Sequence, residues 1–153
     1  LFIIGMVAFM TTHIFNILFF IQFKPSPNSK NTKVYIYTTL LFCFCYLIYV
    51  TLKNAMGNLI YPVLVYMVLI CSSAATAVCT SRNENVKMIA NLFWIPGMLF
   101  FITSDAVLAF NKFSWEKVGP HIKNIGLVTM MTYGIAQLLL VKGFDLYFKN
   151  NKS

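Results

Sequence analysis

Residues 59–81 read LIYPVLVYMVLICSSAATAVCTS, a run of 23 residues without a charged side chain. A helix of about 20 mostly apolar residues is long enough to cross the hydrocarbon core of a bilayer. Four other segments have the same character, so the sequence predicts an all-α protein, a polytopic transmembrane helix bundle that forms a single domain over residues 1–153. The five predicted spans are residues 1–23, 34–53, 59–81, 88–112 and 125–147.

The composition of the whole chain also indicates a membrane protein. Of its 153 residues, 59% are hydrophobic and only 10% are charged, and the mean hydropathy is +0.73. A soluble domain carries about 25% charged residues, so too few charges remain here to cover a water-facing surface. The net charge of +8 would suit nucleic acid, but the basic residues stand singly in short loops between apolar runs. We therefore expect membrane lipids as partners and no nucleic acid.

The basic residues of the loops predict an orientation. Eight lysine and arginine residues fall on one side of the predicted bundle and four on the other, and the side with more of them is expected to be cytoplasmic. The C-terminus is then cytoplasmic, and residue 1 lies on the outer side. The eight are Lys24, Lys30, Lys33, Arg82, Lys87, Lys142, Lys149 and Lys152. The four are Lys53, Lys112, Lys117 and Lys123.

The start of the chain and its cysteines carry further expectations. The chain opens within an apolar run and lacks the basic start of a signal peptide, so we expect upstream sequence. If the complete protein begins in the cytoplasm, that sequence contains an odd number of spans. The four cysteines lie within apolar segments, with no CxxC pair, and are predicted to be small core residues. They are Cys43, Cys45, Cys71 and Cys79.

One acidic residue, Asp105, lies deep within a predicted span. It stands roughly 10 Å from the outer end of the fourth span, at 1.5 Å of rise per residue. A charge at the centre of a bilayer costs roughly 2.5–3.5 kcal/mol on insertion scales, and acids kept there usually face the protein interior and have a function. The alternative is an aspartate that only forms a hydrogen bond between helices. Asp105 is therefore the first candidate functional residue.

Other polar side chains are predicted at similar depths. His13 lies near the middle of the first span, and Tyr133 and Gln137 share one face of the fifth span at i and i+4. Each has a structural alternative, because a histidine can be a satisfied core residue and the pair can form hydrogen bonds between helices. Their common depth in the middle and outer half of the membrane favours a site shared with Asp105.

Two further patterns concern how the helices pack. Pro96 and Gly97 interrupt the fourth span two turns before Asp105, and a proline can kink a helix. A kink that opens a cavity beside Asp105 and ordinary packing of membrane helices are equally open at this point. A stretch of small residues in the third span predicts a close helix–helix contact. It comprises Ser72, Ser73, Ala74, Ala75 and Ala77.

Three blocks of this sequence resemble motifs of the YhhN family, which includes the animal lysoplasmalogenases. The fourth span matches the pattern F-x-x-SD-x-x-LA from Phe101 to Ala109. The fifth span matches TY-x-x-AQ-x-L from Thr132 to Leu139. The first span matches F-x-x-G-x-x-x-F-x-x-x-H from Phe2 to His13, and the three blocks occur in the family's order.

The resemblance implies a fold of eight spans, of which this chain would supply the last five. It also implies a second intramembrane aspartate, in a GD block that would lie upstream of Leu1. The chain departs from the family at Asn16, where members often have tyrosine. Whether this chain is active without the second aspartate is left open by the resemblance.

The same resemblance implies an ether hydrolase that cleaves the vinyl ether of a lysoplasmalogen to a fatty aldehyde and a glycerophospho-alcohol. Two carboxylates in different environments would divide the acid and base roles, without a metal or another cofactor. Asp105 and His13 are the predicted catalytic residues. Ser104, Tyr133 and Gln137 are predicted to bind the substrate, a lysophospholipid or ether lipid.

Two other functions remain open from the sequence. An aspartate near the membrane midplane, a histidine and a broken helix also suit a proton-coupled transporter. The departure at Asn16 leaves room for a membrane protein that keeps the family fold and binds lipid without catalysis.

Overall fold

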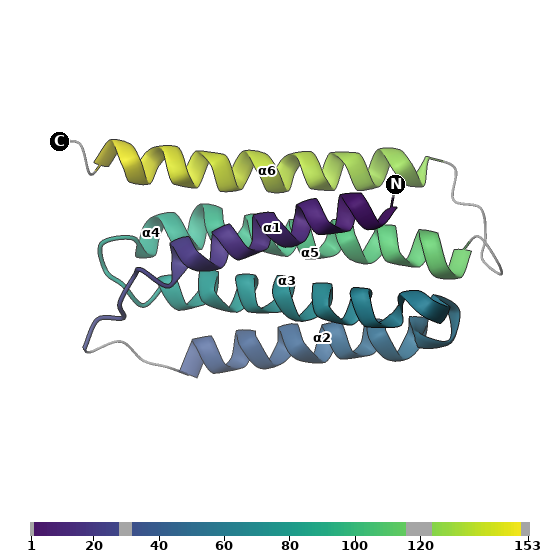
Figure 1. The fold of residues 1–153 in the computed structure, drawn as a ribbon. Helices are drawn as coiled ribbons and strands as arrows, with labels where there is room; N and C mark the ends of the chain where they lie inside the picture. The colour runs from purple at the N-terminus through teal and green to yellow at the C-terminus, as the bar shows by residue number, and fades with distance from the viewer. Residues whose placement is uncertain (1, 28–31, 116–123, 151–153) are drawn as a thin grey trace.

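The computed structural model describes residues 2–27, 32–115 and 124–150, and in these ranges all regular structure is helical. The prediction of an all-α protein is therefore confirmed. The long helices lie side by side in one bundle (Figure 1). They are α1 (Phe2–Phe20), α2 (Thr32–Met56), α3 (Ile60–Thr80), α5 (Ile95–Phe110) and α6 (Ile125–Asn150). Short elements join or extend them, namely η1 (Gly57–Leu59), α4 (Lys87–Ile89), η2 (Ala90–Trp94) and η3 (Asn111–Trp115).

Three helical stretches are long and apolar enough to cross a membrane. They are Val34–Thr80, Lys87–Phe113 and Ile125–Asn150, with 47, 27 and 26 residues. The first contains both α2 and α3, because Gly57 takes a φ of 52° and the chain turns back there. The apolar helix Ile4–Phe20 is shorter than these stretches. The helices suit an integral membrane protein, and the count of five spans out of eight remains a prediction.

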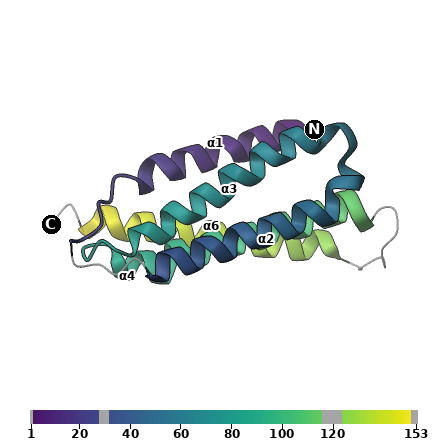
Figure 2. The same cartoon turned by 90° about the horizontal axis from the view of Figure 1, so that it is seen from below.

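Helix α3 is the central element of the bundle. It packs extensively against α1 on one side and α2 on the other, and it also contacts α5, which in turn pairs with α6 (Figure 2). The predicted small-residue contact is confirmed, because Ser73, Ala74 and Ala77 of α3 are buried. Small side chains let neighbouring helix backbones approach closely, and this is how α3 accommodates partners on several faces.

Trp94 is the largest fully buried side chain of the described residues, and it lies at the end of the π-helical turn η2. Its indole contacts Phe20 and Phe23 of the α1 end, with ring centroids 5.4 and 5.5 Å away, and Phe144 of α6 at 6.0 Å. The aromatic cluster therefore joins the first, fourth and last predicted spans at one end of the bundle. A side chain added at Gly143 would meet the Trp94 indole, since a Cβ there would lie 2.5 Å from Nε1.

Pro96 does not end the fourth predicted span. The π-helical turn of Ala90–Trp94 precedes it, and the helix runs on through α5. Such a turn is a common way for a helix to absorb a local irregularity. A Cβ at Gly97 would lie 3.0 Å from Leu140 of α6, so the Pro-Gly pair brings α5 close to α6. Of the two alternatives, this contact supports ordinary helix packing.

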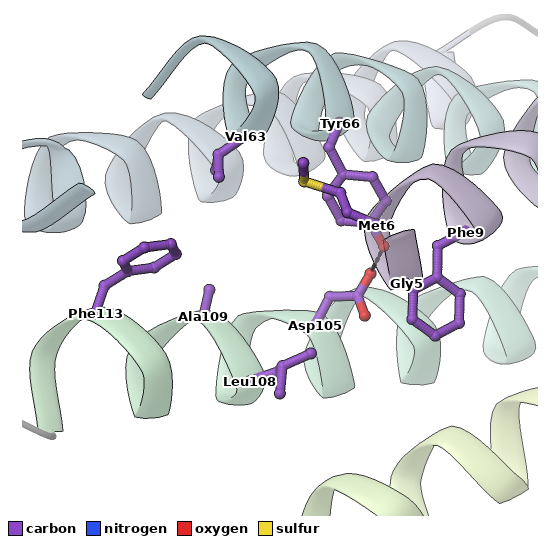
Figure 3. Close-up of a pocket in the computed structure, with 9 residues that line it drawn as sticks. All are labelled: Gly5, Met6, Phe9, Val63, Tyr66, Asp105, Leu108, Ala109 and Phe113. Atoms are coloured by element: carbon purple, nitrogen blue, oxygen red, sulfur yellow. Dashed lines mark hydrogen bonds between the residues drawn. The ribbon is translucent and has the colours of Figure 1, made fainter. Parts of the chain in front are cut away.

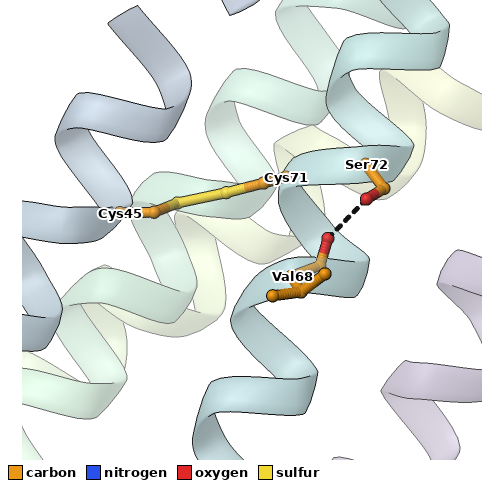
Figure 4. Close-up of a disulfide and its surroundings, with 4 residues drawn as sticks. All are labelled: Cys45, Val68, Cys71 and Ser72. Carbon is orange, nitrogen blue, oxygen red and sulfur yellow. Dashed lines mark hydrogen bonds between the residues drawn. A yellow bond between two sulfur atoms is a disulfide. The ribbon is translucent and has the colours of Figure 1, made fainter. Parts of the chain in front are cut away.

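The prediction for the cysteines was correct only in part. Cys45 and Cys71 are buried, as expected of core residues, but their sulfur atoms form a disulfide that links α2 to α3 (Figure 4). Cys43 is exposed and Cys79 is partly buried, and both are free. The pairing could not be read from the sequence because 26 positions separate the two residues and each lies within an apolar run.

Several basic residues of the described ranges lie at one end of the bundle. The segment after α1 meets the turn after α3, where the Asn83 side chain donates a hydrogen bond to the Lys24 carbonyl over 2.9 Å. The end of α6 lies at the same end of the bundle (Figure 1). Here Lys149 forms an ion pair with Asp145, with a nitrogen–oxygen distance of 2.9 Å. Lys30, Lys117, Lys123 and Lys152 lie outside the described residues. Which end faces the cytoplasm remains a prediction.

Candidate functional site

Asp105 projects from α5 toward α3, where the Tyr66 hydroxyl donates a hydrogen bond to its Oδ2 atom (Figure 3). Tyr66 lies near the start of α3 and Asp105 near the end of α5, so the two side chains share a level in the antiparallel pair. Among the described residues, Tyr66 is the one that forms a hydrogen bond with the Asp105 carboxyl group. In Figure 3 the second carboxyl oxygen points away from Tyr66. Asp105 therefore has one oxygen held and one available.

A cavity of about 180 Å³ lies beside this pair. Its wall is apolar except for the Asp105 carboxyl group and the Tyr66 hydroxyl, and it is formed by α1, α3 and the α5–η3 helix (Figure 3). The lining residues are Gly5, Met6, Phe9, Val63, Tyr66, Asp105, Leu108, Ala109 and Phe113. The cavity combines an acid with space for an apolar group.

A second and smaller cavity, of about 50 Å³, lies toward α2. Val63, Tyr66, Asp105 and Ala109 line both cavities, so the hydrogen-bonded pair stands at the boundary between them. The core contains two hydrophobic clusters, one that includes Trp94 and Phe101 and one that includes Leu52 and Phe113, and Tyr66 packs against both. The position of the Asp105 carboxyl group therefore depends on packing from three helices.

His13 lies close to the pair without touching the carboxyl group. Its imidazole is fully buried, 4.8 Å between ring centroids from Phe101 and 5.9 Å from Tyr66. Neither ring nitrogen has a hydrogen-bond partner within the described part of the chain. Buried polar atoms normally have a partner, so these two nitrogens are an exception, and His13 lines neither cavity that contains Asp105. Tyr66 thus contacts both residues, His13 through its ring and Asp105 through its hydroxyl.

The two predicted residues of α6 do not line the cavities that contain Asp105. The Tyr133 ring packs edge-on against Phe9 and Phe101, with centroids 5.6 and 5.5 Å away. Gln137 is partly buried and lines neither of the two cavities that contain Asp105. The structure thus brings Tyr66 and Asp105 together, with His13 beside Tyr66 and Tyr133 beside Phe9 and Phe101.

Ser104, predicted to bind substrate, is turned toward α6. Its hydroxyl is buried and donates a hydrogen bond to the Thr129 carbonyl over 3.0 Å. This bond joins α5 to α6 on the side of α5 that faces away from the cavity. The geometry gives Ser104 a structural contact between helices.

We expect Ser104→Ala to lower the stability slightly, by about 0.6 kcal/mol, which is typical of a hydrogen bond between membrane helices. Thermal unfolding in detergent measures this effect. Activity per folded molecule should stay near that of the wild type, because the hydroxyl is occupied by Thr129. A loss of activity without a loss of stability would return Ser104 to the substrate site.

Tyr66 is the residue of this site that the sequence patterns missed. It lies in none of the three family blocks and carries no charge, so it looked like an ordinary tyrosine of an apolar helix that has two of them. One signal was present: a phenol hydroxyl within a span needs a hydrogen-bond partner, and Tyr66 and Asp105 are both a short way from the same end of antiparallel helices. A comparison of the membrane depths of all polar residues in the predicted spans would have paired Tyr66 with Asp105.

No group of three His, Cys, Asp or Glu side chains within the described ranges is close enough to hold a metal ion. The polar groups near the cavity are instead one carboxyl, one phenol and one imidazole. Such a set can transfer a proton or bind a polar group, and the surrounding apolar wall can hold hydrocarbon.

The apolar helices and the acid enclosed among them define an integral membrane protein with an internal site. The family model described as YhhN matches residues 1–144. The chain therefore belongs to the YhhN family. No curated protein and no solved structure matches the chain.

Proposed function

We propose that this protein is a lysoplasmalogenase-like hydrolase, which cleaves the vinyl ether bond of a lysophospholipid. The observation that carries the proposal is the Asp105 carboxyl group, with one oxygen held by Tyr66 and the other available at an apolar cavity of about 180 Å³. Membership of a family that includes lysoplasmalogenases supports the choice of reaction. The substrate class and the products follow from that family relationship.

The reaction needs a proton donor, a negative group near a cation and a water molecule. A carboxylic acid gives its proton to the β-carbon of the vinyl ether, using the electron pair of the C=C bond, and an oxocarbenium ion results. Water adds to the carbon beside the oxygen and loses a proton to a carboxylate. The hemiacetal then breaks its bond to the glycerol oxygen and yields a fatty aldehyde and a glycerophospho-alcohol. General acid–base assistance of this kind contributes about 10²- to 10⁴-fold in rate.

Asp105 has the surroundings that the proton donor requires. An apolar cavity favours the uncharged form of a carboxyl group, which is the form that carries the proton to be transferred. A second carboxylate, which the family resemblance implies upstream of Leu1, would stabilise the cation or activate water. The two roles can also be exchanged between these carboxylates. His13 contacts the ring of Tyr66 and does not line the cavity, so its part in orienting the substrate stays a prediction.

The apolar lining fits the hydrocarbon side of the substrate. Met6, Val63 and Phe113 surround the cavity beyond the carboxyl group, where part of an alkenyl chain would lie. The vinyl ether is then beside Asp105. Burial of the alkenyl chain holds the reacting carbon close to the Asp105 carboxyl group. The binding energy of the alkenyl chain thereby orients the substrate for the reaction.

We expect Gly5→Leu to block the cavity while leaving the fold intact. Gly5 lines the cavity, and a Cβ added there meets no atom within 4 Å, so a side chain fits without a clash and takes up the space. Activity should fall at least about tenfold, mainly through a higher KM, since hydrophobic groups in a pocket discriminate over this range. Gly126→Leu is the matched control, because Gly126 also has open space around it and lies on α6 away from the cavity. Equal activity of the two variants would contradict a substrate chain in this cavity.

The proposed reaction is tested with the full-length protein in liposomes. Lysoplasmalogen is supplied, and release of fatty aldehyde is measured against protein-free liposomes. Aldehyde formation supports the hydrolase. Proton or solute flux without aldehyde formation would contradict it and favour a transporter, and lipid binding with neither activity would favour a non-catalytic protein.

A further inference from the structure

Tyr66 connects the acid to the core of the bundle in a way that the proposed reaction can use. Its ring is held between the two hydrophobic clusters and beside His13, and its hydroxyl reaches across from α3 to α5. The hydroxyl donates to Oδ2 of Asp105, and the other oxygen points away from it (Figure 3). The two oxygens of the carboxyl group are therefore not equivalent.

We propose that Tyr66 is a positioning residue that directs the proton of Asp105 to Oδ1 and stabilises the carboxylate after that proton has left. This inference rests on the proposed function. A neutral aspartic acid carries its proton on one of two oxygens, and the hydrogen atom of the Tyr66 hydroxyl occupies the lone pair of Oδ2 that faces it. The acidic proton is then on Oδ1, the oxygen that Tyr66 does not hold.

The same hydrogen bond changes strength during the proton transfer. The O–H bond of Asp105 breaks, the C–H bond at the β-carbon of the vinyl ether forms, and the carboxyl group becomes an anion. A hydrogen bond to an anion is roughly twice as strong as one between neutral groups. Tyr66 therefore stabilises the transition state more than the bound substrate, and such an interaction acts on kcat.

A structural role alone predicts a different outcome. A hydrogen bond that only joins α3 to α5 would contribute to stability, and its loss would reduce the amount of folded protein without changing kcat per folded molecule. The surroundings of Tyr66 allow the two roles to be separated, because its ring is packed independently of its hydroxyl. Tyr66→Phe keeps the ring contacts and removes only the donor.

The test measures kcat and KM for aldehyde release with the full-length protein in liposomes, together with the thermal midpoint of unfolding. We expect Tyr66→Phe to lower kcat about 10- to 100-fold with little change in KM, the range that corresponds to one hydrogen bond to a charged group. Tyr61→Phe is the control, since Tyr61 is on the same helix and 77% exposed. Fluorinated tyrosines at position 66, which are stronger donors of similar size, should raise kcat in order of donor strength.

The outcomes separate this inference from the proposed function. If Asp105→Asn abolishes aldehyde release and Tyr66→Phe retains wild-type kcat, Asp105 acts without Tyr66 and the inference is wrong. If Tyr66→Phe lowers only the unfolding midpoint, the bond is structural and the inference is also wrong. If Asp105→Asn retains full activity, the proposed role of Asp105 itself fails.

Discussion

Asp105→Asn is expected to reduce aldehyde release by about 10²- to 10⁴-fold, the contribution of a positioned general acid. Asparagine has nearly the same shape as aspartic acid, and its carbonyl oxygen can still accept the hydrogen bond from Tyr66. The packing around α5 therefore changes little, whereas the proton that the reaction consumes is gone. Product formation from lysoplasmalogen, measured per folded molecule in liposomes, gives the result.

The chain offers a matched control for this substitution. Asp145→Asn also removes a carboxylate, but Asp145 is at the end of α6, where it pairs with Lys149 and is exposed to solvent. An exposed ion pair contributes little to stability, so this variant should behave like the wild type. Near-normal turnover of Asp105→Asn would contradict the catalytic role of Asp105, whatever the behaviour of the control.

Gly143→Ala is expected to have the largest effect on stability. The added methyl group would lie 2.5 Å from Nε1 and 2.6 Å from Cδ1 of the Trp94 indole, which is closer than real contacts allow. The indole is fully buried against aromatic rings of α1 and α6, so it has little freedom to move away. Overpacking of a tight core costs about 1–3 kcal/mol. The thermal midpoint of unfolding in detergent measures the loss.

Two variants show whether the clash is the cause. Gly126→Ala introduces the same methyl group into α6 at a place with open space, and it should leave the midpoint unchanged or raise it, because alanine favours a helix over glycine. Trp94→Phe combined with Gly143→Ala should recover part of the lost stability, since the smaller ring makes room. An unchanged midpoint for Gly143→Ala alone would show that the helices separate easily at this contact.

The residue types of the sequence were sufficient to predict the general class of structure. Long apolar segments separated by polar loops predict membrane helices, because an unpaired backbone group is costly in lipid and a helix pairs all but its ends. The same rule made Asp105 conspicuous, because an acid in a span requires a reason. The family blocks around Phe9, Asp105 and Tyr133 could also be read directly, and the family match agrees with them.

The partners of these residues could not be read from the sequence. Ser104 is adjacent to Asp105 in the chain, yet its hydroxyl bonds to Thr129 on α6 while the carboxyl group of Asp105 faces α3. Successive side chains of a helix point in directions about 100° apart around its axis, so neighbours in the sequence lie on different faces of the helix. Tyr133 and Gln137 share a helix face, but neither of them lines a cavity that contains Asp105.

By itself, the sequence determined that this chain is helical, belongs in a membrane and carries an acid at depth. These properties depend on hydropathy and helix length, which are local. Only the tertiary structure decided that Tyr66 holds the acid, that Cys45 meets Cys71 and that an apolar cavity opens beside Gly5. The physical reason is that these contacts depend on the rotation and axial shift of each helix against its neighbours. Side-chain packing across the whole bundle sets those two quantities, and no single segment contains them.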